Sequence, residues 1–272
     1  MIYDDRICAL GEGPLWHPSR DELFWFDILG KRMLARGAEW SWGEHVSAAG
    51  WIDDDTLLVA SETALWRVDL TTGAREHVVA LEADNPITRS NDGRADPQGG
   101  FWIGTMGKQT EAFAGAIYRY YRGELRQLFD RITVPNSIAF APSGDLAYFT
   151  DTFGKRILRV SLDAQGWPKE PEVFLDMRAE GLNPDGSVVD AAGNLWNAQW
   201  GASRVACYSP GGVLLETVTI PARQASCPAF GGADLATLFV TSAADGLQGA
   251  KEGLTYAVDT PHTGQPEHRV IL

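Results

Sequence analysis

The chain has 272 residues, of which 44% are apolar and 22% charged, and its formal net charge is −13. The apolar content is that of an ordinary folded protein. The negative charge argues against nucleic acids and anionic membrane surfaces as partners, since both attract basic proteins. No apolar run reaches the roughly 18 residues of a membrane span, and the first residues lack the basic and apolar regions of a secretory signal. We therefore expect a cytoplasmic protein, either a monomer or a weak homo-oligomer.

Short segments that alternate apolar and polar residues run along the whole chain, separated by turns rich in Gly, Pro, Asp and Asn. In chain order they include ELFWFDI, LWRVDL, GAIYRY, ILRVSL and RVACYS. This pattern predicts many short antiparallel strands and little helix.

Several of these predicted strands occupy the same place in a loose internal repeat, after a turn that contains Asp or Gly. One large apolar residue marks each repeat, and the markers are Trp25, Leu58, Trp102, Tyr148, Trp196 and Phe239. The first gap is 33 residues, and the other four average about 45, the length of a four-stranded propeller blade. We therefore predict an all-β fold, a single six-bladed β-propeller domain of four-stranded blades over residues 1–272. A β-sandwich is the alternative, because it also has strands at similar spacing.

Four side chains that carry oxygen precede a marker by 11 to 13 residues: Glu12, Asn91, Asn136 and Asp185. Each lies near Gly or Pro, which predicts a loop. Residues at the same position of a repeat occupy equivalent places in successive blades, so we expect the four to surround one end of the central channel. Carboxylate and amide oxygens suit a divalent cation such as Ca²⁺, Mg²⁺ or Mn²⁺, and Zn²⁺ or Fe²⁺ are also compatible. Ordinary turn-forming side chains are the alternative.

Other catalytic signatures are absent from the sequence. It contains no G-x-S-x-G, H-E-x-x-H or nucleotide-binding glycine motif. The three cysteines, Cys8, Cys207 and Cys227, are widely spaced and are predicted to be reduced, buried thiols. The acidic run 53–55 is predicted to be a hairpin turn, because it lacks the Gly and the final Glu of a calcium loop.

Six ordered motifs of this chain resemble those of the SMP-30/gluconolactonase/regucalcin-like family. They are GEGPLW, R-x-NDG with D-P-x-G, GTM, PNSI, PDG with D-x-x-G-x-LW, and S-C-x-x-F-G-G, and they lie between about residues 8 and 246. The resemblance implies a six-bladed propeller with one divalent metal ion. It implies Glu12, Asn136 and Asp185 as metal ligands, and Arg89 and Asn91 as substrate contacts.

The resemblance also implies that Asp185 is the catalytic acid/base. Relatives of the regucalcin type carry a substrate-contacting glutamate shortly after GTM. An ungapped comparison puts Gln109 in that place, and Glu111 is the alternative. We expect an apolar wall from Trp16, Phe153 or Trp200.

The function that follows is metal-dependent hydrolysis of a sugar (aldono-) lactone to its aldonic acid, in bacterial sugar catabolism. The expected small-molecule partner is therefore a sugar lactone. Two alternatives remain open at this point. One is a non-sugar lactonase or phosphotriesterase-like hydrolase on the same scaffold, and the other is a calcium-binding regulatory protein without turnover.

Overall fold

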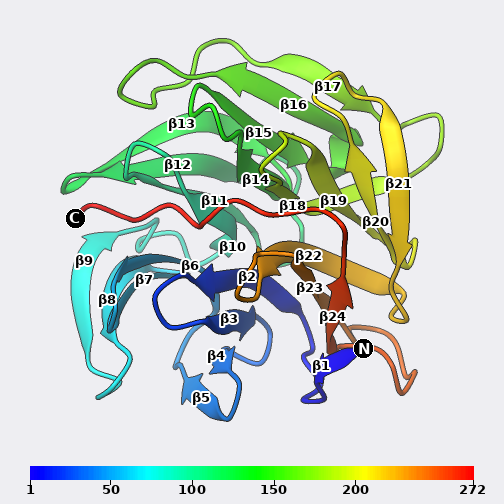
Figure 1. Ribbon diagram of the computed structural model, residues 1–272. Helices are drawn as coiled ribbons and strands as arrows, with labels where there is room; N and C mark the ends of the chain where they lie inside the picture. The colour runs from blue at the N-terminus through cyan, green and yellow to red at the C-terminus, as the bar shows by residue number, and fades with distance from the viewer.

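Six four-stranded antiparallel sheets make up the computed structural model, which describes residues 1–272. The sheets surround a central axis as the blades of a propeller (Figure 1). The one helix is a short 3-10 turn, η1 (Thr152–Gly154), and no helix is long and apolar enough to cross a membrane. The predicted all-β propeller of six four-stranded blades is confirmed.

The blades follow one another along the chain, and in blades 1–5 the innermost strand comes first. Blade 1 contains β2 (Gly11–His17), β3 (Glu22–Asp27), β4 (Arg32–Ala35) and β5 (Ala38–Ser41), and blade 2 contains β6 (Val46–Asp53), β7 (Thr56–Ser61), β8 (Ala64–Asp69) and β9 (Arg75–Ala80). Blade 3 contains β10 (Thr88–Ala95), β11 (Phe101–Gly107), β12 (Gly115–Tyr121) and β13 (Glu124–Ile132), and blade 4 contains β14 (Pro135–Phe140), β15 (Leu146–Asp151), β16 (Arg156–Ser161) and β17 (Glu172–Asp176). Blade 5 contains β18 (Asn183–Val189), β19 (Leu195–Trp200), β20 (Arg204–Tyr208) and β21 (Leu214–Thr219), and blade 6 contains β22 (Gln224–Gly231), β23 (Thr237–Ala243), β24 (Thr255–Asp259) and β1 (Ile2–Asp4).

Blade 6 joins the two ends of the chain and closes the ring. Its three inner strands come from the C-terminal part of the chain, whereas its outermost strand is β1, paired antiparallel with β24. The N-terminal ammonium of Met1 also donates a hydrogen bond to the Ala257 carbonyl at 2.7 Å. Each innermost strand lies against the innermost strands of both neighbouring blades, so the central channel is enclosed on all sides.

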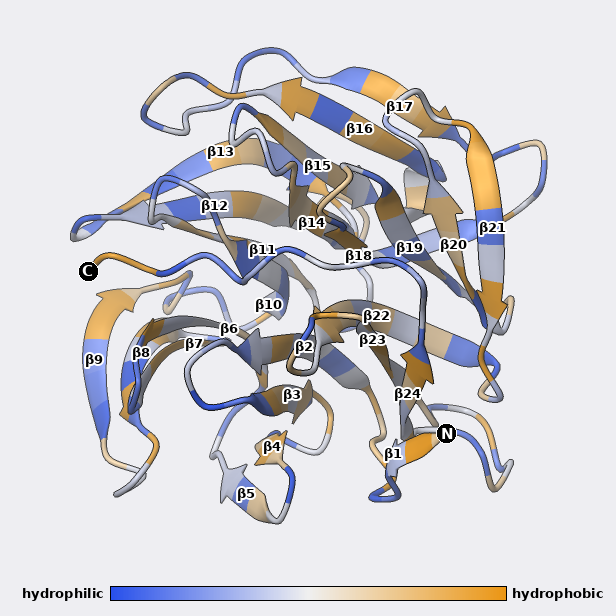
Figure 2. Cartoon of the chain, viewed as in Figure 1, coloured by the Kyte–Doolittle hydropathy of each residue, from blue (hydrophilic) through white to orange (hydrophobic).

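All six marker residues lie on the second strand of their blade and are buried. Clusters of buried apolar side chains fill the interfaces between neighbouring blades. Apolar colour accordingly runs along the strands in Figure 2, whereas the connecting turns are largely polar. The aromatic repeat in the sequence therefore reflects blade-to-blade packing, since no single blade can bury both of its faces.

The segment after β24 crosses the face at which the innermost strands end (Figure 1). It bonds to the backbone carbonyls of Leu235, Val189, Phe140, Gly99 and Trp51, in blades 6, 5, 4, 3 and 2. Glu267 of this segment forms an ion pair with Arg94 of β10, which lies in the channel wall. This C-terminal strap covers one end of the channel, so a ligand has access from the other end.

Two smaller predictions are also confirmed. Cys8, Cys207 and Cys227 are free and buried. The run of aspartates at 53–55 forms the hairpin turn between β6 and β7.

Candidate active site

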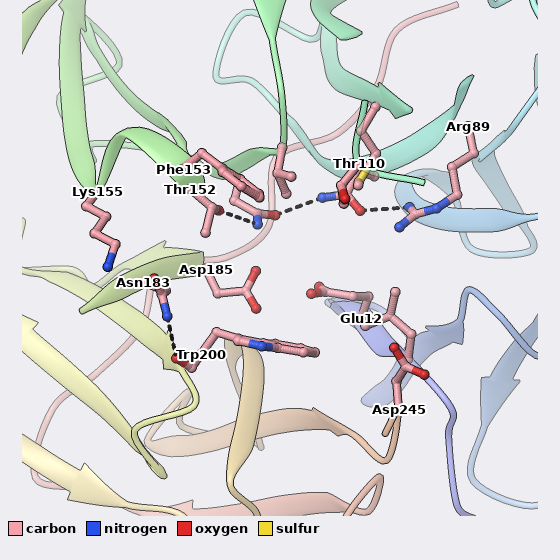
Figure 3. Close-up of a pocket in the computed structure, with 15 residues that line it drawn as sticks. Glu12, Arg89, Thr110, Thr152, Phe153, Lys155, Asn183, Asp185, Trp200 and Asp245 are labelled. Atoms are coloured by element: carbon pink, nitrogen blue, oxygen red, sulfur yellow. Dashed lines mark hydrogen bonds between the residues drawn. The ribbon is translucent and has the colours of Figure 1, made fainter. Parts of the chain in front are cut away.

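A cavity of about 440 Å³ opens at the face where the innermost strands begin, opposite the C-terminal strap. Glu12, Asn91, Asn136 and Asp185 all line it, together with Arg89 (Figure 3). The prediction that the four oxygen-bearing residues meet at one end of the channel is confirmed. They come from blades 1, 3, 4 and 5.

The loops expected around these residues are wrong, because each of the four lies inside an innermost strand. The pairing with the second strand shifts between Glu12 and Leu15, between Asn136 and Ala139, and between Pro184 and Ser187. Such a β-bulge breaks the strict alternation of a strand and re-aims a side chain. The Gly and Pro residues nearby therefore serve a bulge at the rim of the channel rather than a turn.

Backbone dihedrals show how the bulge forms in two of these strands. The residue after Glu12 is Gly13, with a φ of 54°, and the residue after Asn136 is Ser137, with a φ of 58°. At Gly13 a glycine is required, because a Cβ there would lie 2.2 Å from the Ser47 carbonyl oxygen. The left-handed residue lets the preceding side chain face the cavity instead of the neighbouring blade.

Blades 2 and 6 have the same register shift but carry hydroxyl groups there. Ser47 of β6 donates its hydroxyl hydrogen to Ser90 Oγ at 2.8 Å, and Ser226 of β22 donates to the Gly11 carbonyl. These short side chains join neighbouring innermost strands and do not line the cavity. The candidate ligands therefore come from blades 1, 4 and 5, with Glu12 across the channel from Asn136 and Asp185.

Hydrogen bonds fix the orientation of the two asparagines. Asn136 Nδ2 donates to Thr152 Oγ1 at 2.9 Å, which turns Asn136 Oδ1 toward Asn91, whose Nδ2 donates to it at 3.0 Å. Asn91 Oδ1 in turn accepts a hydrogen bond from Arg89 Nη1 at 2.8 Å (Figure 3). An amide oxygen has two lone pairs, so Asn136 Oδ1 still has one to offer to a ligand.

Glu12 and Asp185 point toward each other across the cavity floor (Figure 3). Burial raises the pKa of Glu12 to about 8, and the negative charge of Asp92 adds to the rise. Burial likewise raises the pKa of Asp185 well above its ordinary value, with the charges of Glu12 and Asp92 as further causes. The Arg89 guanidinium opposes the rise for Glu12 but is bonded to Asn91. Two buried carboxylates that lack a cation as bonding partner make this a place for added positive charge.

The donor set fits a divalent cation. Two carboxylates would neutralise a 2+ charge, and the Asn136 amide would add a neutral oxygen. The chain contains no cluster of three or more His, Cys, Asp or Glu side chains suited to a metal ion. A cation at this site would therefore depend on Asn136 for its third protein oxygen.

Gln109, the predicted substrate contact, lies on the turn after β11 with an exposed side chain outside the cavity lining. Its backbone N–H donates to Glu111 Oε2 at 3.0 Å, and Glu111 does not line the cavity either. The lining residue of this turn is Thr110. The contact predicted for Gln109 remains a prediction that the geometry does not favour.

Of the three aromatic residues expected at the mouth, Phe153 and Trp200 line the cavity. Phe153 is 66% exposed, so it projects from the rim rather than packing into a blade. Trp16 was wrongly expected there. It is buried between blades 1 and 6, where its ring stacks on Phe239 at a centroid distance of 5.4 Å.

Several lining residues were not predicted from the sequence. Thr110, Thr152, Lys155 and Asp245 lie on the turns that follow the second strands, and Asn183 is the first residue of β18. Most follow a marker residue by a few positions, as Thr152 follows Tyr148. The turn after each second strand also recurs once per blade, so its residues could have been predicted to line the cavity as well.

Residues 10–244 match the family described as the SMP-30/gluconolactonase/LRE-like region. The chain belongs to this family. The match includes all four oxygen-bearing residues and both residues of the Arg89–Asn91 pair. Membership confirms the resemblance found in the motifs.

Within the family, the chain is 36% identical to the L-arabinolactonase of Azospirillum brasilense, over 97% of this chain and 89% of that protein. It is 32% identical to the 6-deoxy-6-sulfogluconolactonase of Pseudomonas putida, over 86% of this chain and 83% of that protein. Among solved structures it is similar to a calcium-binding protein, regucalcin, from Agrobacterium tumefaciens. That chain is 38% identical with a TM-score of 0.96, and the match covers 100% of this chain and 97% of the other.

Proposed function

We propose that this protein hydrolyses a sugar lactone to the open-chain aldonic acid, with a divalent cation held by Glu12, Asn136 and Asp185. The observation that carries the proposal is the convergence of these three side chains on the floor of one open cavity. The names of the lactonase relatives support a sugar lactone as the substrate class. Hydrolysis of such a lactone would serve the breakdown of a sugar.

Asp185 is the proposed base of the reaction. Its carboxylate accepts a proton from a water molecule as the water oxygen attacks the lactone carbonyl carbon. The ring C–O bond then breaks, and the ring oxygen receives a proton as it becomes the new hydroxyl group. Burial and the charges of Glu12 and Asp92 raise the pKa of Asp185, and a bound cation would lower it again, which keeps the carboxylate ionised and able to accept the proton. A bound divalent cation would supply Lewis-acid stabilisation of the negative charge that develops on the carbonyl oxygen.

Arg89 and Asn91 are proposed to hold the sugar. Arg89 uses Nη1 to bond Asn91 and the Ser90 carbonyl, so its remaining N–H groups are available to substrate hydroxyls. The Asn91–Asn136 hydrogen bond ties this pair to the proposed ligand set. A substrate held by Arg89 is thereby placed at a set distance from Asp185, which lowers the entropic cost of the reaction.

A panel of aldonolactones, with proton release as the readout, tests the proposal. We expect acid release from at least one pentono- or hexonolactone. Exhaustive chelation should abolish it and lower the melting temperature, because a cation bound only by the folded state stabilises that state. Restoring Ca²⁺, Mg²⁺, Mn²⁺, Zn²⁺ or Fe²⁺ one at a time identifies the cation that supports turnover.

The same panel separates the competing functions. The similarity to a calcium-binding protein favours, as second candidate, cation binding without turnover. That function would give the stabilisation by cation and no acid release from any lactone. Hydrolysis of non-sugar lactones or phosphotriesters alone would instead identify another hydrolase on the same scaffold. An unchanged rate after complete removal of metal would contradict the role given to the cation.

A further inference from the structure

The cavity has basic side chains on two opposite sides, and only one of them belongs to the proposed reaction centre. Arg89 of β10 lies on one side, and Lys155, at the end of η1, lies on the other, with Asp185 and Glu12 between them (Figure 3). A lactone whose carbonyl lies above the carboxylates would therefore extend toward both cations.

Lys155 has unused hydrogen-bonding capacity. Its Nζ donates to the Gly181 carbonyl at 3.1 Å, and no acidic side chain forms an ion pair with it. An ammonium group has three N–H donors, so two remain available. Lys155 is the only lysine in the cavity lining, so its free donors are available to a bound substrate.

The backbone conformation at Lys155 sets the direction of its side chain. Its φ is 51° and its ψ is 35°, the left-handed conformation that favours glycine over residues with a side chain. Gly154 stands directly before it and has an ordinary φ. The same conformation occurs at Lys31, so at Lys155 it fixes the direction of the side chain, and the place of that side chain in the cavity wall carries the inference.

The neighbours of Lys155 complete a small polar subsite. Asn183 Nδ2 donates to the Trp200 carbonyl at 3.3 Å, so its Oδ1 is free to accept a hydrogen bond. Phe153 and Trp200 supply apolar surface at the same end of the cavity (Figure 3). An ammonium, an amide oxygen and two aromatic rings suit a short carbon arm that carries hydroxyl or anionic oxygens.

We propose that Lys155 is a specificity-determining residue, which binds the oxygens on the exocyclic arm of the lactone, on the side of the cavity opposite Arg89. The inference rests on the proposed lactonase function and names the part of the substrate that Lys155 recognises. Hydroxyl and anionic arms share the oxygen chemistry that an ammonium binds.

Selectivity between lactones with and without an exocyclic arm tests this role. The probes are a hexonolactone with a hydroxylated arm, the same lactone with a terminal carboxylate or sulfonate, and a ring-hydroxylated four-carbon lactone without an arm. In Lys155→Met the ratio of kcat/KM for an armed lactone to that for the armless one should fall at least about tenfold, the value of one hydrogen bond to a charged group. The loss should appear mainly in KM, and Lys155→Arg should restore most of it.

Lys31→Met is the matched control, because Lys31 also has a left-handed backbone, with a φ of 54°, but lies outside the cavity lining. Equal selectivity of Lys155→Met and wild type, with equal melting temperatures, would overturn the inference and leave the lactonase function standing. A greater loss for the anionic arm than for the hydroxylated arm would identify an acidic sugar lactone as substrate. If the wild-type protein hydrolyses no lactone of the panel, the proposed function itself fails and the inference fails with it.

Discussion

At the scale of single residues, the environment of Asp185 explains its proposed role. The side chain is 4% exposed, faces Glu12 and carries a raised pKa. An ordinary surface aspartate has none of these properties, and their combination in a cavity is typical of functional carboxylates. Its position in the bulge of β18, rather than its residue type alone, gives it access to a substrate.

Asp185→Asn should lower kcat for the preferred lactone by at least about 100-fold, because the amide cannot accept the proton of the attacking water. After chelation the melting temperature should not fall, since the two side chains have the same shape, whereas with cation present it should lie below that of wild type because a charged ligand is lost. Asp234→Asn, in the turn between β22 and β23, is the control and should keep full activity. A wild-type rate in a correctly folded Asp185→Asn protein would contradict the assignment.

At the scale of strands, the close approach of β18 and β22 holds the bulge in place. Gly186, which follows Asp185, lies so near β22 that a Cβ would be 2.3 Å from Cys227 Sγ. Cys227 is buried against this glycine. The PDG and S-C-x-x-F-G-G motifs, which are about 40 residues apart in the sequence, therefore meet at one contact beneath the cavity.

Gly186→Ala should lower the free energy of unfolding by about 1–3 kcal/mol, the usual cost of overpacking a core position. Because the strain acts next to Asp185, kcat/KM should fall as well. Gly211→Ala in the same blade is the control, since the nearest atom to a Cβ there is Ser209 Oγ at 3.8 Å. Denaturant unfolding and lactone kinetics of both variants give the comparison, and equal effects would show that β18 tolerates the change.

At the scale of the whole molecule, the C-terminal strap connects five blades across the closed end of the channel. Its ion pair with Arg94 is nearly buried, with side-chain exposures of 10% for Arg94 and 7% for Glu267. Arg94 Nε has no partner of its own, so Glu267 is the main compensation for this charge. The strap therefore stabilises blade 3 through Glu267, which is far from that blade in the sequence.

Glu267→Ala should lower the free energy of unfolding by about 3–5 kcal/mol, because it leaves a buried guanidinium without a counter-ion. The exposed pair of Glu124 and Arg126 provides the control. Glu124→Ala should cost less than about 1 kcal/mol, since water screens an exposed pair. Denaturant unfolding measures both, and a cost for Glu267→Ala no larger than that of the control would show that the strap is dispensable.

The sequence by itself determined the strand repeat, the six blades, and the four oxygen-bearing residues that share one phase. It could do so because strand alternation and marker spacing are local properties. In a repeat fold, residues at the same position of each repeat also occupy equivalent places in each blade. Relation to a known family was likewise contained in the ordered motifs.

Only the tertiary structure decided which further residues line the cavity and how the predicted side chains reach it. The ring closes through β1, and bulges rather than loops aim Glu12, Asn136 and Asp185. Gln109 lies outside the lining, whereas Thr110 and Lys155 lie within it. These outcomes depend on contacts between blades that are distant in sequence, and on side-chain directions that a one-residue shift in strand register reverses.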